Sequence, residues 1–307
     1  MTPNLFTDAQ LRSKDIETLK RWLRVKLGGY TVATNDMSAS NIIFRGVPWT
    51  EQPSTISDVS YCPAAKVTKL GRVNRVGQSA FYGSLGGPVV FYELRAKQGD
   101  CIALSEWQVT EPLWMHNLGY HYSALQRMGT PIIRQRLTNP IPNETKRNER
   151  LREQLSRAFT EDVCEGQEYR YKQSIAINEL LFDKAEPIRQ FPNGPKSGVV
   201  AGTVYPAMQL RGAADNIAIR PDVVDAGGLR LKSVRYVLVE AANEQSASYI
   251  FLTMAISRAF SGEEIVWQKS LPSEKQRRST IALEKDNWVL RDGFGNIYAM
   301  QQANRFP

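Results

Sequence analysis

Residues 71–93 hold four side chains whose chemistry suits a single ligand. Arg72, Tyr82, Ser84 and Glu93 lie around turns and one short strand in Gly-Arg-Val-Asn-Arg-Val-Gly-Gln-Ser-Ala-Phe-Tyr-Gly-Ser-Leu-Gly-Gly-Pro-Val-Val-Phe-Tyr-Glu. An arginine holds a phosphate through paired hydrogen bonds, and a tyrosine offers a stacking face and a hydroxyl. A glutamate binds sugar hydroxyls or stabilises a developing positive charge. Together these residue types fit a ligand that is anionic, aromatic and ribosylated, which means a nucleotide.

This stretch resembles part of the RES domain family, which is named for an arginine, a glutamate and a serine. Three other blocks occur in the family's order along the chain. They are Ile-Ile-Phe-Arg-Gly at 42–46, Tyr-Arg-Tyr-Lys-Gln-Ser-Ile-Ala-Ile-Asn-Glu at 169–179, and Gly-Thr-Val-Tyr-Pro-Ala-Met-Gln-Leu-Arg-Gly-Ala-Ala-Asp-Asn-Ile-Ala-Ile at 202–219. The four blocks together extend the resemblance over about residues 40–225.

The resemblance implies an α+β fold like that of ADP-ribosyltransferases, with a mixed sheet core and flanking helices. It also implies that the chain acts on nicotinamide adenine dinucleotide (NAD) as the toxin of a toxin–antitoxin pair. The reaction would cleave the nicotinamide–ribose bond. The acceptor stays open: water makes a glycohydrolase, phosphate a phosphorylase, and a protein side chain an ADP-ribosyltransferase. The implied partners are NAD, a cognate antitoxin and, for the last reaction, an acceptor protein.

The resemblance also implies which residues carry the reaction. Bond cleavage forms a ribosyl oxocarbenium ion, and Glu93 is expected to stabilise its charge and hold ribose hydroxyls. Arg72 and Ser84 complete the expected catalytic group. The residues expected to clamp the pyrophosphate, stack on the nicotinamide or its ribose, or line the pocket are Arg45, Arg72, Tyr82, Tyr205 and Asn216.

Several of these residues have ordinary structural alternatives. Arg45 fits the surface end of a strand, and Tyr205 fits a core tyrosine whose hydroxyl is bonded. Tyr82 alternates with Phe81, so one ring should face the core and the other a cleft. Glu93 follows Val-Val-Phe-Tyr, and a carboxylate buried beside such an apolar run needs a purpose or an ion-pair partner.

The chain departs from the family pattern at Ala207, where the family usually has serine after Tyr-Pro. The serine role is therefore either missing or supplied by Ser84 or Ser174. Residue 207 is expected at the mouth of the pocket, because Pro206 should end the strand before it. Without that hydroxyl, the alternative function is a catalytically weak module of the same fold that binds NAD or another nucleotide.

Composition excludes several other classes. The chain has 307 residues, two histidines and three cysteines. An odd number of widely spaced cysteines makes no disulfide framework, and the spacing of His116 and His121 suits no zinc site, so we expect a cytoplasmic protein without a metal. The longest apolar stretch near the C-terminus, 249–256, is too short to span a bilayer, and the first residues do not read as a secretory signal. No contact with a membrane is expected.

The net charge of +8 leaves one further alternative, a basic nucleic-acid-binding protein. Much of the charge lies in 146–157 and 275–278. Helical spacing predicts ion pairs in the first run, such as Glu149–Arg152 and Glu153–Arg157, which indicates a solvated helix face. No helix-turn-helix or zinc-finger pattern supports direct nucleic-acid binding, so it is not expected.

The expected order of elements is typical of an α+β protein rather than of alternating βαβ units. Helices are predicted at 7–28, 89–97, 144–160 and 172–184, and strands at 41–45, 79–84, 101–109 and 199–205, with further strand-like runs at 233–240, 264–268 and 280–290. Three consecutive segments follow: an N-terminal helical extension at 1–40, a RES-like catalytic domain at 41–225, and a strand-rich extension at 226–307. Arg75 is expected to be solvated.

Overall fold

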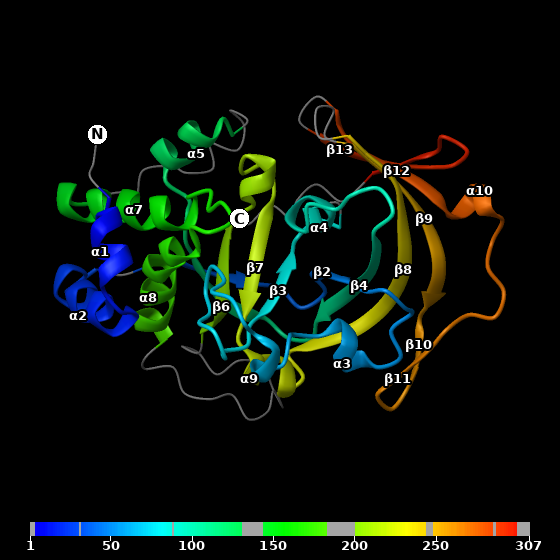
Figure 1. Ribbon diagram of the computed structural model, residues 1–307, viewed down its shortest axis with the longest axis horizontal. Coiled ribbons are helices and arrows are strands. Elements are labelled where there is room, and N and C mark those ends of the chain that lie inside the picture. Colours follow the sequence, from blue (N-terminus) through cyan, green and yellow to red (C-terminus); the bar gives the residue numbers. More distant parts are fainter. Residues whose placement is uncertain are drawn as a thin grey trace. The chain divides into compact units, whose positions relative to one another are not determined.

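The computed structural model describes residues 4–30, 32–87, 89–130, 144–182, 200–243, 248–284 and 287–299. The protein is mixed α+β, and its strands pair mostly antiparallel (Figure 1). The chain forms two compact units, each assembled from separate stretches. Unit 1 comprises 1–37, 62–81 and 112–227, and unit 2 comprises 38–61, 82–111 and 228–307. These limits differ from the consecutive segments expected from the sequence.

Unit 1 combines a small sheet with most of the helices. Its strands lie in the order β1 (Thr34–Met37), β5 (Leu113–Asn117), β6 (Val200–Pro206) and β7 (Asp215–Ile219), and only β5 and β6 run parallel. Its α-helices are α1 (Asp8–Ser13), α2 (Ile16–Lys26), α5 (Tyr122–Met128), α7 (Lys146–Phe159), α8 (Tyr171–Phe182) and α9 (Pro221–Asp225). Short 3₁₀ helices are η1 (Ala64–Lys66), η2 (Glu168–Arg170) and η3 (Met208–Leu210).

The single N-terminal helix expected at 7–28 is wrong, because the structure divides it into α1 and α2. The predicted capping box is confirmed, since the Thr7 hydroxyl accepts from the Gln10 amide at 3.2 Å. Lys14 then leaves the helix in an extended conformation. Asp15 begins α2 by accepting from the Thr18 amide at 2.7 Å. A carboxylate at an N-cap stabilises a helix start, and here it overrides the continuous apolar periodicity.

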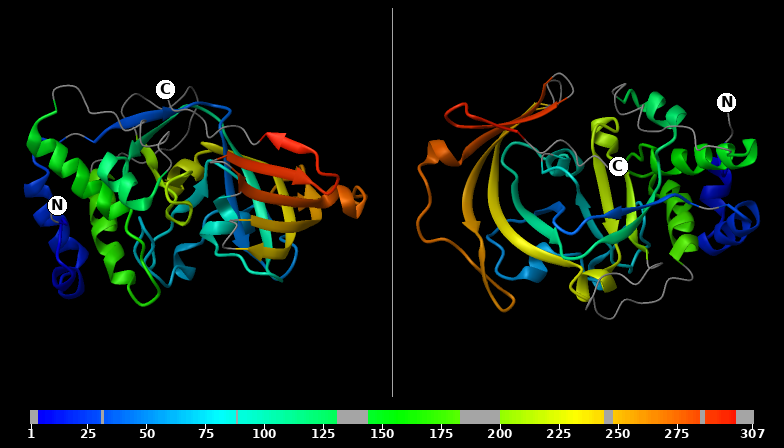
Figure 2. Two further views of the ribbon diagram at one scale, coloured as in Figure 1. Left: turned by 90° about the horizontal axis from the view of Figure 1, so that it is seen from above. Right: turned by 180° about the vertical axis from the view of Figure 1, so that it is seen from behind.

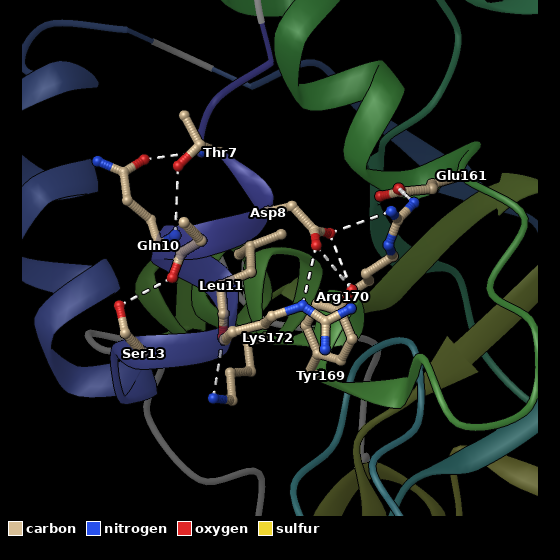
Figure 3. A network of polar contacts seen from close by, with 11 residues as sticks. Thr7, Asp8, Gln10, Leu11, Ser13, Glu161, Tyr169, Arg170 and Lys172 are labelled. Carbon is tan, nitrogen blue, oxygen red and sulfur yellow. Dashed lines mark hydrogen bonds and ion pairs between the residues drawn. The ribbon is translucent and has the colours of Figure 1, made fainter.

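Polar contacts fasten α1 to the segment that leads into α8 (Figure 3). The Asp8 carboxylate accepts from the Tyr169 hydroxyl at 2.9 Å and pairs with the Arg170 guanidinium at 3.0 Å. The Lys172 ammonium donates to the carbonyls of Leu11 and Lys14, at 3.0 and 3.1 Å. Those two carbonyls lie at the end of α1, where a cation also interacts favourably with the helix dipole.

Unit 2 is dominated by a curved antiparallel sheet (Figure 2). Its strand order is β3 (Phe81–Ser84), β2 (Ile42–Pro48), β4 (Cys101–Val109), β8 (Leu229–Asn243), β9 (Ser248–Ser257), β12 (Arg278–Glu284), β13 (Asn287–Asp292) and β14 (Ile297–Ala299), although Phe81 itself belongs to unit 1. A separate hairpin joins β10 (Ala259–Ser261) to β11 (Glu264–Val266). The short helices are α3 (Ile56–Val59), α4 (Val89–Glu93) and α10 (Glu274–Arg277). The strands expected after residue 226 are thus confirmed.

Helix α4 packs its aromatic residues on strand β9 of this sheet. The Phe91 ring stacks on Phe251 at 5.0 Å, and Tyr92 meets Tyr249 edge to face at 4.7 Å. The helix ends at Glu93, not at residue 97 as expected. Arg95 takes a left-handed conformation with φ of 49°, and the Ala96 amide returns to the Phe91 carbonyl. This reversal closes the helix early and buries Ala96.

Candidate functional site

Arg45 lies within β2, and its guanidinium ties neighbouring segments of unit 2 together. Its Nε donates to the Ser60 carbonyl at 2.8 Å, and its Nη1 donates to the Tyr82 carbonyl at 2.7 Å. The Ser105 hydroxyl in turn donates to the Arg45 carbonyl at 3.1 Å. The strand continues to Pro48, so Arg45 does not sit at its end. The side chain therefore has a structural role that the sequence did not reveal.

Two expected site residues lie on β3 beside Arg45. Phe81 is fully buried while Tyr82 is half-buried, which confirms the predicted alternation. Ser84 is buried and pairs with Phe44 of β2, the residue before Arg45. The strand pairing thus brings Tyr82, Ser84 and Arg45 together in unit 2.

Glu93 is exposed at the end of α4. The four apolar residues before it, Val89 to Tyr92, are buried. The helix turns its apolar face inward and its carboxylate outward, so the cost of burying Glu93 does not arise. Gly46, next to Arg45, lets this helix approach β2, because a Cβ there would lie 2.1 Å from a Val90 methyl. No larger residue leaves room for that approach.

Arg72 of unit 1 is held between a carbonyl and two aromatic rings. Its Nη2 donates to the Glu161 carbonyl at 3.1 Å. The guanidinium carbon lies 5.3 Å from the Tyr171 ring centroid and 5.8 Å from that of Tyr205, within cation–π range. Its Nη1 is buried and has no hydrogen-bond partner among the described residues. One buried donor of this cation therefore has no acceptor among the described residues.

Tyr205 and Asn216 join Arg72 on one face of the unit 1 sheet. They are register partners in the antiparallel pair of β6 and β7, so their side chains share a face. Both side chains are buried. The Arg72 guanidinium lies beside the Tyr205 ring, which places it at the same face. The three residues expected to bind ligand in this unit therefore converge, although they lie far apart in the sequence.

Ser174 and Ala207 are both fully buried. The Ser174 hydroxyl faces two carbonyls, that of Arg72 at 2.6 Å and that of Tyr171 at 3.1 Å. The Ala207 amide donates to the Ala214 carbonyl at 2.8 Å, and β6 ends at Pro206 as expected. The expectation that residue 207 lies at a pocket mouth is wrong, because the turn after Pro206 folds back and covers it.

A cavity of about 230 Å³ opens in unit 1 beside α8. Its polar lining includes Asn178, Glu179 and Arg220, and Phe182 adds an aromatic wall. Arg220 is paired with the Asp222 carboxylate, which also lines the cavity. None of the residues expected at the site is among its described lining, so this cavity is separate from the Arg72 and Tyr205 face.

Arg75 is paired rather than solvated, contrary to expectation. Its guanidinium makes a two-pronged contact with the Glu179 carboxylate of α8 and also reaches Glu17 of α2. Lys20 adds a second cation at 3.1 Å from Glu179. The hydrogen bonds that the Arg75 guanidinium donates to the Glu179 carboxylate are the main cause that raises the pKa of Arg75 above its ordinary value. This cluster ties α2, α8 and the segment after Arg72 together within unit 1.

The ion pairs expected on the basic helix α7 are half confirmed. Arg157 pairs with Glu153 at 2.8 Å, as the spacing predicted. Arg152 instead pairs with Glu144 at 2.8 Å, and this carboxylate precedes the helix. Both arginine side chains are mostly buried by these contacts. Charge on this helix is thus partly neutralised within unit 1.

The described residues contain no group of histidine, cysteine, aspartate and glutamate that suits a metal ion. His116 is buried, its two ring nitrogens lack hydrogen-bond partners in the described part of the chain, and burial lowers its pKa to about 4. His121 instead caps α5. Within the described ranges, no helix has the length and apolar character that a bilayer crossing demands.

Comparisons with protein-family models, with curated proteins and with solved structures give no match to this chain. The family resemblance therefore rests on the four sequence blocks alone.

Proposed function

We propose that the chain is a RES-type enzyme that cleaves the nicotinamide–ribose bond of NAD. The observation that supports this proposal is the gathering of motif residues within each unit. In unit 1, Arg72, Tyr205 and Asn216 meet at one face of the sheet. In unit 2, Arg45 contacts the Tyr82 segment, and Gly46 brings the helix of Glu93 against the same strand. As an extension of the proposal, the fold is ADP-ribosyltransferase-like and the protein works with a cognate antitoxin in the cytoplasm.

Arg72 supplies the anion-binding group in this proposal. Its Nη1, which has no hydrogen-bond partner among the described residues, can donate to a phosphate oxygen, and the Tyr171 and Tyr205 rings flank the guanidinium. A charge-assisted bond formed where water is largely excluded is stronger than one at the surface. The Tyr205 ring offers an apolar surface next to this cation.

Glu93 supplies the negative charge for the reaction. Its carboxylate is exposed at the end of α4. As the C–N glycosidic bond breaks, nicotinamide leaves with the bonding electron pair and positive charge develops on the ribose. Glu93 stabilises that charge. With water as acceptor, the water oxygen bonds to the ribosyl carbon and the water loses a proton to solvent. The products are ADP-ribose and nicotinamide.

The test is to incubate purified protein with NAD, with and without phosphate, and to measure nicotinamide release and the ribosyl product. Free ADP-ribose identifies water as the acceptor, and a phosphorylated product identifies phosphate. NAD binding without nicotinamide release would overturn the enzyme proposal and support the alternative that Ala207 favours, a module that binds the nucleotide without turning it over. Salt-sensitive binding of DNA or RNA, with neither NAD binding nor release, would overturn the proposal in favour of nucleic acid.

Substitutions of the two arginines should separate ligand binding from stability. We expect Arg72→Ala to weaken NAD affinity about 10- to 100-fold, because a bond between a cation and an anion is lost. We expect Arg45→Ala to lower the free energy of unfolding by about 1 to 3 kcal/mol, because the Ser60 and Tyr82 carbonyls lose their donor. Calorimetric titration and urea unfolding measure the two effects. Unchanged affinity in Arg72→Ala would make that arginine purely structural.

Ala207→Ser tests whether the family's serine is missing. We expect turnover not to rise and the free energy of unfolding to fall by about 1 kcal/mol, because the new hydroxyl enters a fully buried turn. Thermal unfolding and the nicotinamide assay measure both quantities. A tenfold gain in turnover would instead show that residue 207 reaches the substrate.

A further inference from the structure

Helix α8 presents polar side chains to the segment that carries Arg72. The Ser174 hydroxyl donates to the Arg72 carbonyl at 2.6 Å, and the Asn178 amide Nδ2 donates to the Val73 carbonyl at 3.4 Å. The next residue of the helix, Glu179, holds the Arg75 guanidinium. Residues four apart lie on one face of a helix, so Ser174 and Asn178 contact adjacent peptide groups. The backbone at 72–73 is thus fixed against two turns of α8.

The Ser174 hydroxyl is fully used in hydrogen bonding to backbone carbonyls. It is fully buried, and its single proton is directed at the carbonyls of Arg72 and Tyr171. A serine hydroxyl has one proton to donate, so a hydroxyl held at 2.6 Å by a carbonyl does not serve a substrate at the same time. Asn178 is equally fixed, because its Oδ1 accepts from the buried Thr203 hydroxyl of β6 at 2.8 Å.

The guanidinium end of Arg72 depends on the same helix. Its partner is the carbonyl of Glu161, whose carboxylate accepts from Arg170 and from Gln173, each at 2.6 Å. Figure 3 shows Glu161 beside Arg170, which in turn pairs with Asp8. Gln173 directly precedes Ser174 on α8. Both ends of Arg72 are therefore oriented by neighbouring residues of one helix.

We propose that Ser174 is a positioning residue for Arg72, which holds the arginine at the Tyr205 face so that it binds the pyrophosphate of a dinucleotide. This inference rests on the proposed function and deepens it. The hydroxyl acts through the Arg72 backbone and does not touch the ligand. The hydroxyl that this chain lacks at residue 207, where the family has serine, is then not supplied by Ser174, because Ser174 positions the arginine.

The test is a double-mutant cycle between Ser174→Ala and Arg72→Ala, read as NAD affinity by calorimetric titration. We expect Ser174→Ala alone to weaken binding about 3- to 10-fold, with KM rising more than kcat falls. In the Arg72→Ala background the same substitution should have no further effect on affinity, because the residue it positions is gone. Equal effects in both backgrounds would overturn the proposal, since a merely structural role lowers affinity in both.

Two further variants sharpen the cycle. Ser156→Ala removes another buried helical hydroxyl of unit 1, on α7, and should leave NAD affinity unchanged. Ser174→Cys keeps a side chain of similar size with a weaker donor, and its affinity should lie between those of wild type and Ser174→Ala. An affinity of Ser174→Cys equal to wild type would show that volume, not the hydrogen bond, matters.

A second readout needs no ligand and separates this inference from the proposed function. Amide hydrogen exchange at residues 72–75 should be faster in Ser174→Ala than in Ser156→Ala, because the Arg72 carbonyl loses its donor. Unchanged exchange would overturn the positioning role even if NAD binds. If wild-type protein fails to bind NAD but Ser174→Ala still shows the faster exchange, the proposed function is overturned while the contact between Ser174 and the Arg72 segment remains supported.

Discussion

Replacing Glu93 by glutamine is expected to lower nicotinamide release about 100- to 1000-fold. The substitution keeps the size of the side chain but removes the negative charge that stabilises the ribosyl cation. A rate loss of this size is typical when one electrostatic stabilising group is removed. The carboxylate is exposed while the four residues before it are buried, so the packing of α4 should not change. Stability should therefore match wild type within about 0.5 kcal/mol, as for other surface substitutions.

The measurement is single-turnover nicotinamide release at saturating NAD, with urea unfolding as the control for the fold. A matched control is Glu165→Gln, which changes an exposed glutamate of unit 1 outside the motif blocks. It should leave release unchanged. Full activity in the Glu93→Gln protein would remove Glu93 from the reaction, whatever becomes of the remaining residues.

His116 should make the protein less stable in mild acid. Its pKa is lowered from 6.5 to about 4 by burial, so the unfolded chain takes up a proton at higher pH than the folded chain does. The contribution of neutral His116 is therefore complete above about pH 6.5 and is lost as pH falls toward 4. At about 1.4 kcal/mol for each pKa unit, the loss across this window is about 3 kcal/mol.

The His116→Phe variant isolates this effect. It removes the titrating group and two ring nitrogens that have no hydrogen-bond partner among the described residues. It also places an aromatic ring near Phe182, whose centroid lies 5.3 Å from the imidazole centroid. The difference in unfolding free energy between variant and wild type should grow as pH falls from 6.5 to 4. His121→Asn, which keeps a capping side chain on α5, should retain most of the wild-type pH dependence. A pH-independent difference for His116→Phe would show that the imidazole is solvated.

Local patterns predicted most elements of the chain, and tertiary contacts decided the rest. The strand at Cys101–Val109 was predicted to the residue from its apolar content, and α8 was predicted within a few residues. The break between α1 and α2 was missed because the capping preference of Asp15 competes with an unbroken apolar stripe. The early end of α4 depends on the left-handed backbone at Arg95, and an arginine gives no sequence signal for that conformation.

The site was predictable as a set of residue types but not as a set of contacts. The resemblance selected Arg72 and Tyr205 as candidates, and the structure places the Arg72 guanidinium carbon 5.8 Å from the Tyr205 ring centroid. One partner of the Ser174 hydroxyl lies 102 residues earlier in the chain, so only the fold reveals that this hydroxyl donates to the Arg72 carbonyl. Arg75 was predicted to be solvated because its partner Glu179 lies 104 residues later in the chain. Such pairings are set by which helix packs on which loop, and composition does not encode them.

The interleaving of the two units sets the order in which they can be completed during synthesis. All of unit 1 has left the ribosome once residue 227 has emerged, but unit 2 still lacks 228–307. Until then β4 has no β8 partner along one edge, and Phe91 and Tyr92 have no aromatic ring of β9 to pack on. At about 5 to 20 residues per second, that edge and those rings stay uncovered for several seconds. The nascent chain therefore carries an unpaired strand edge of the kind that chaperones protect. The helix that ends at Glu93 packs fully only after the strands from residue 229 onward have been made.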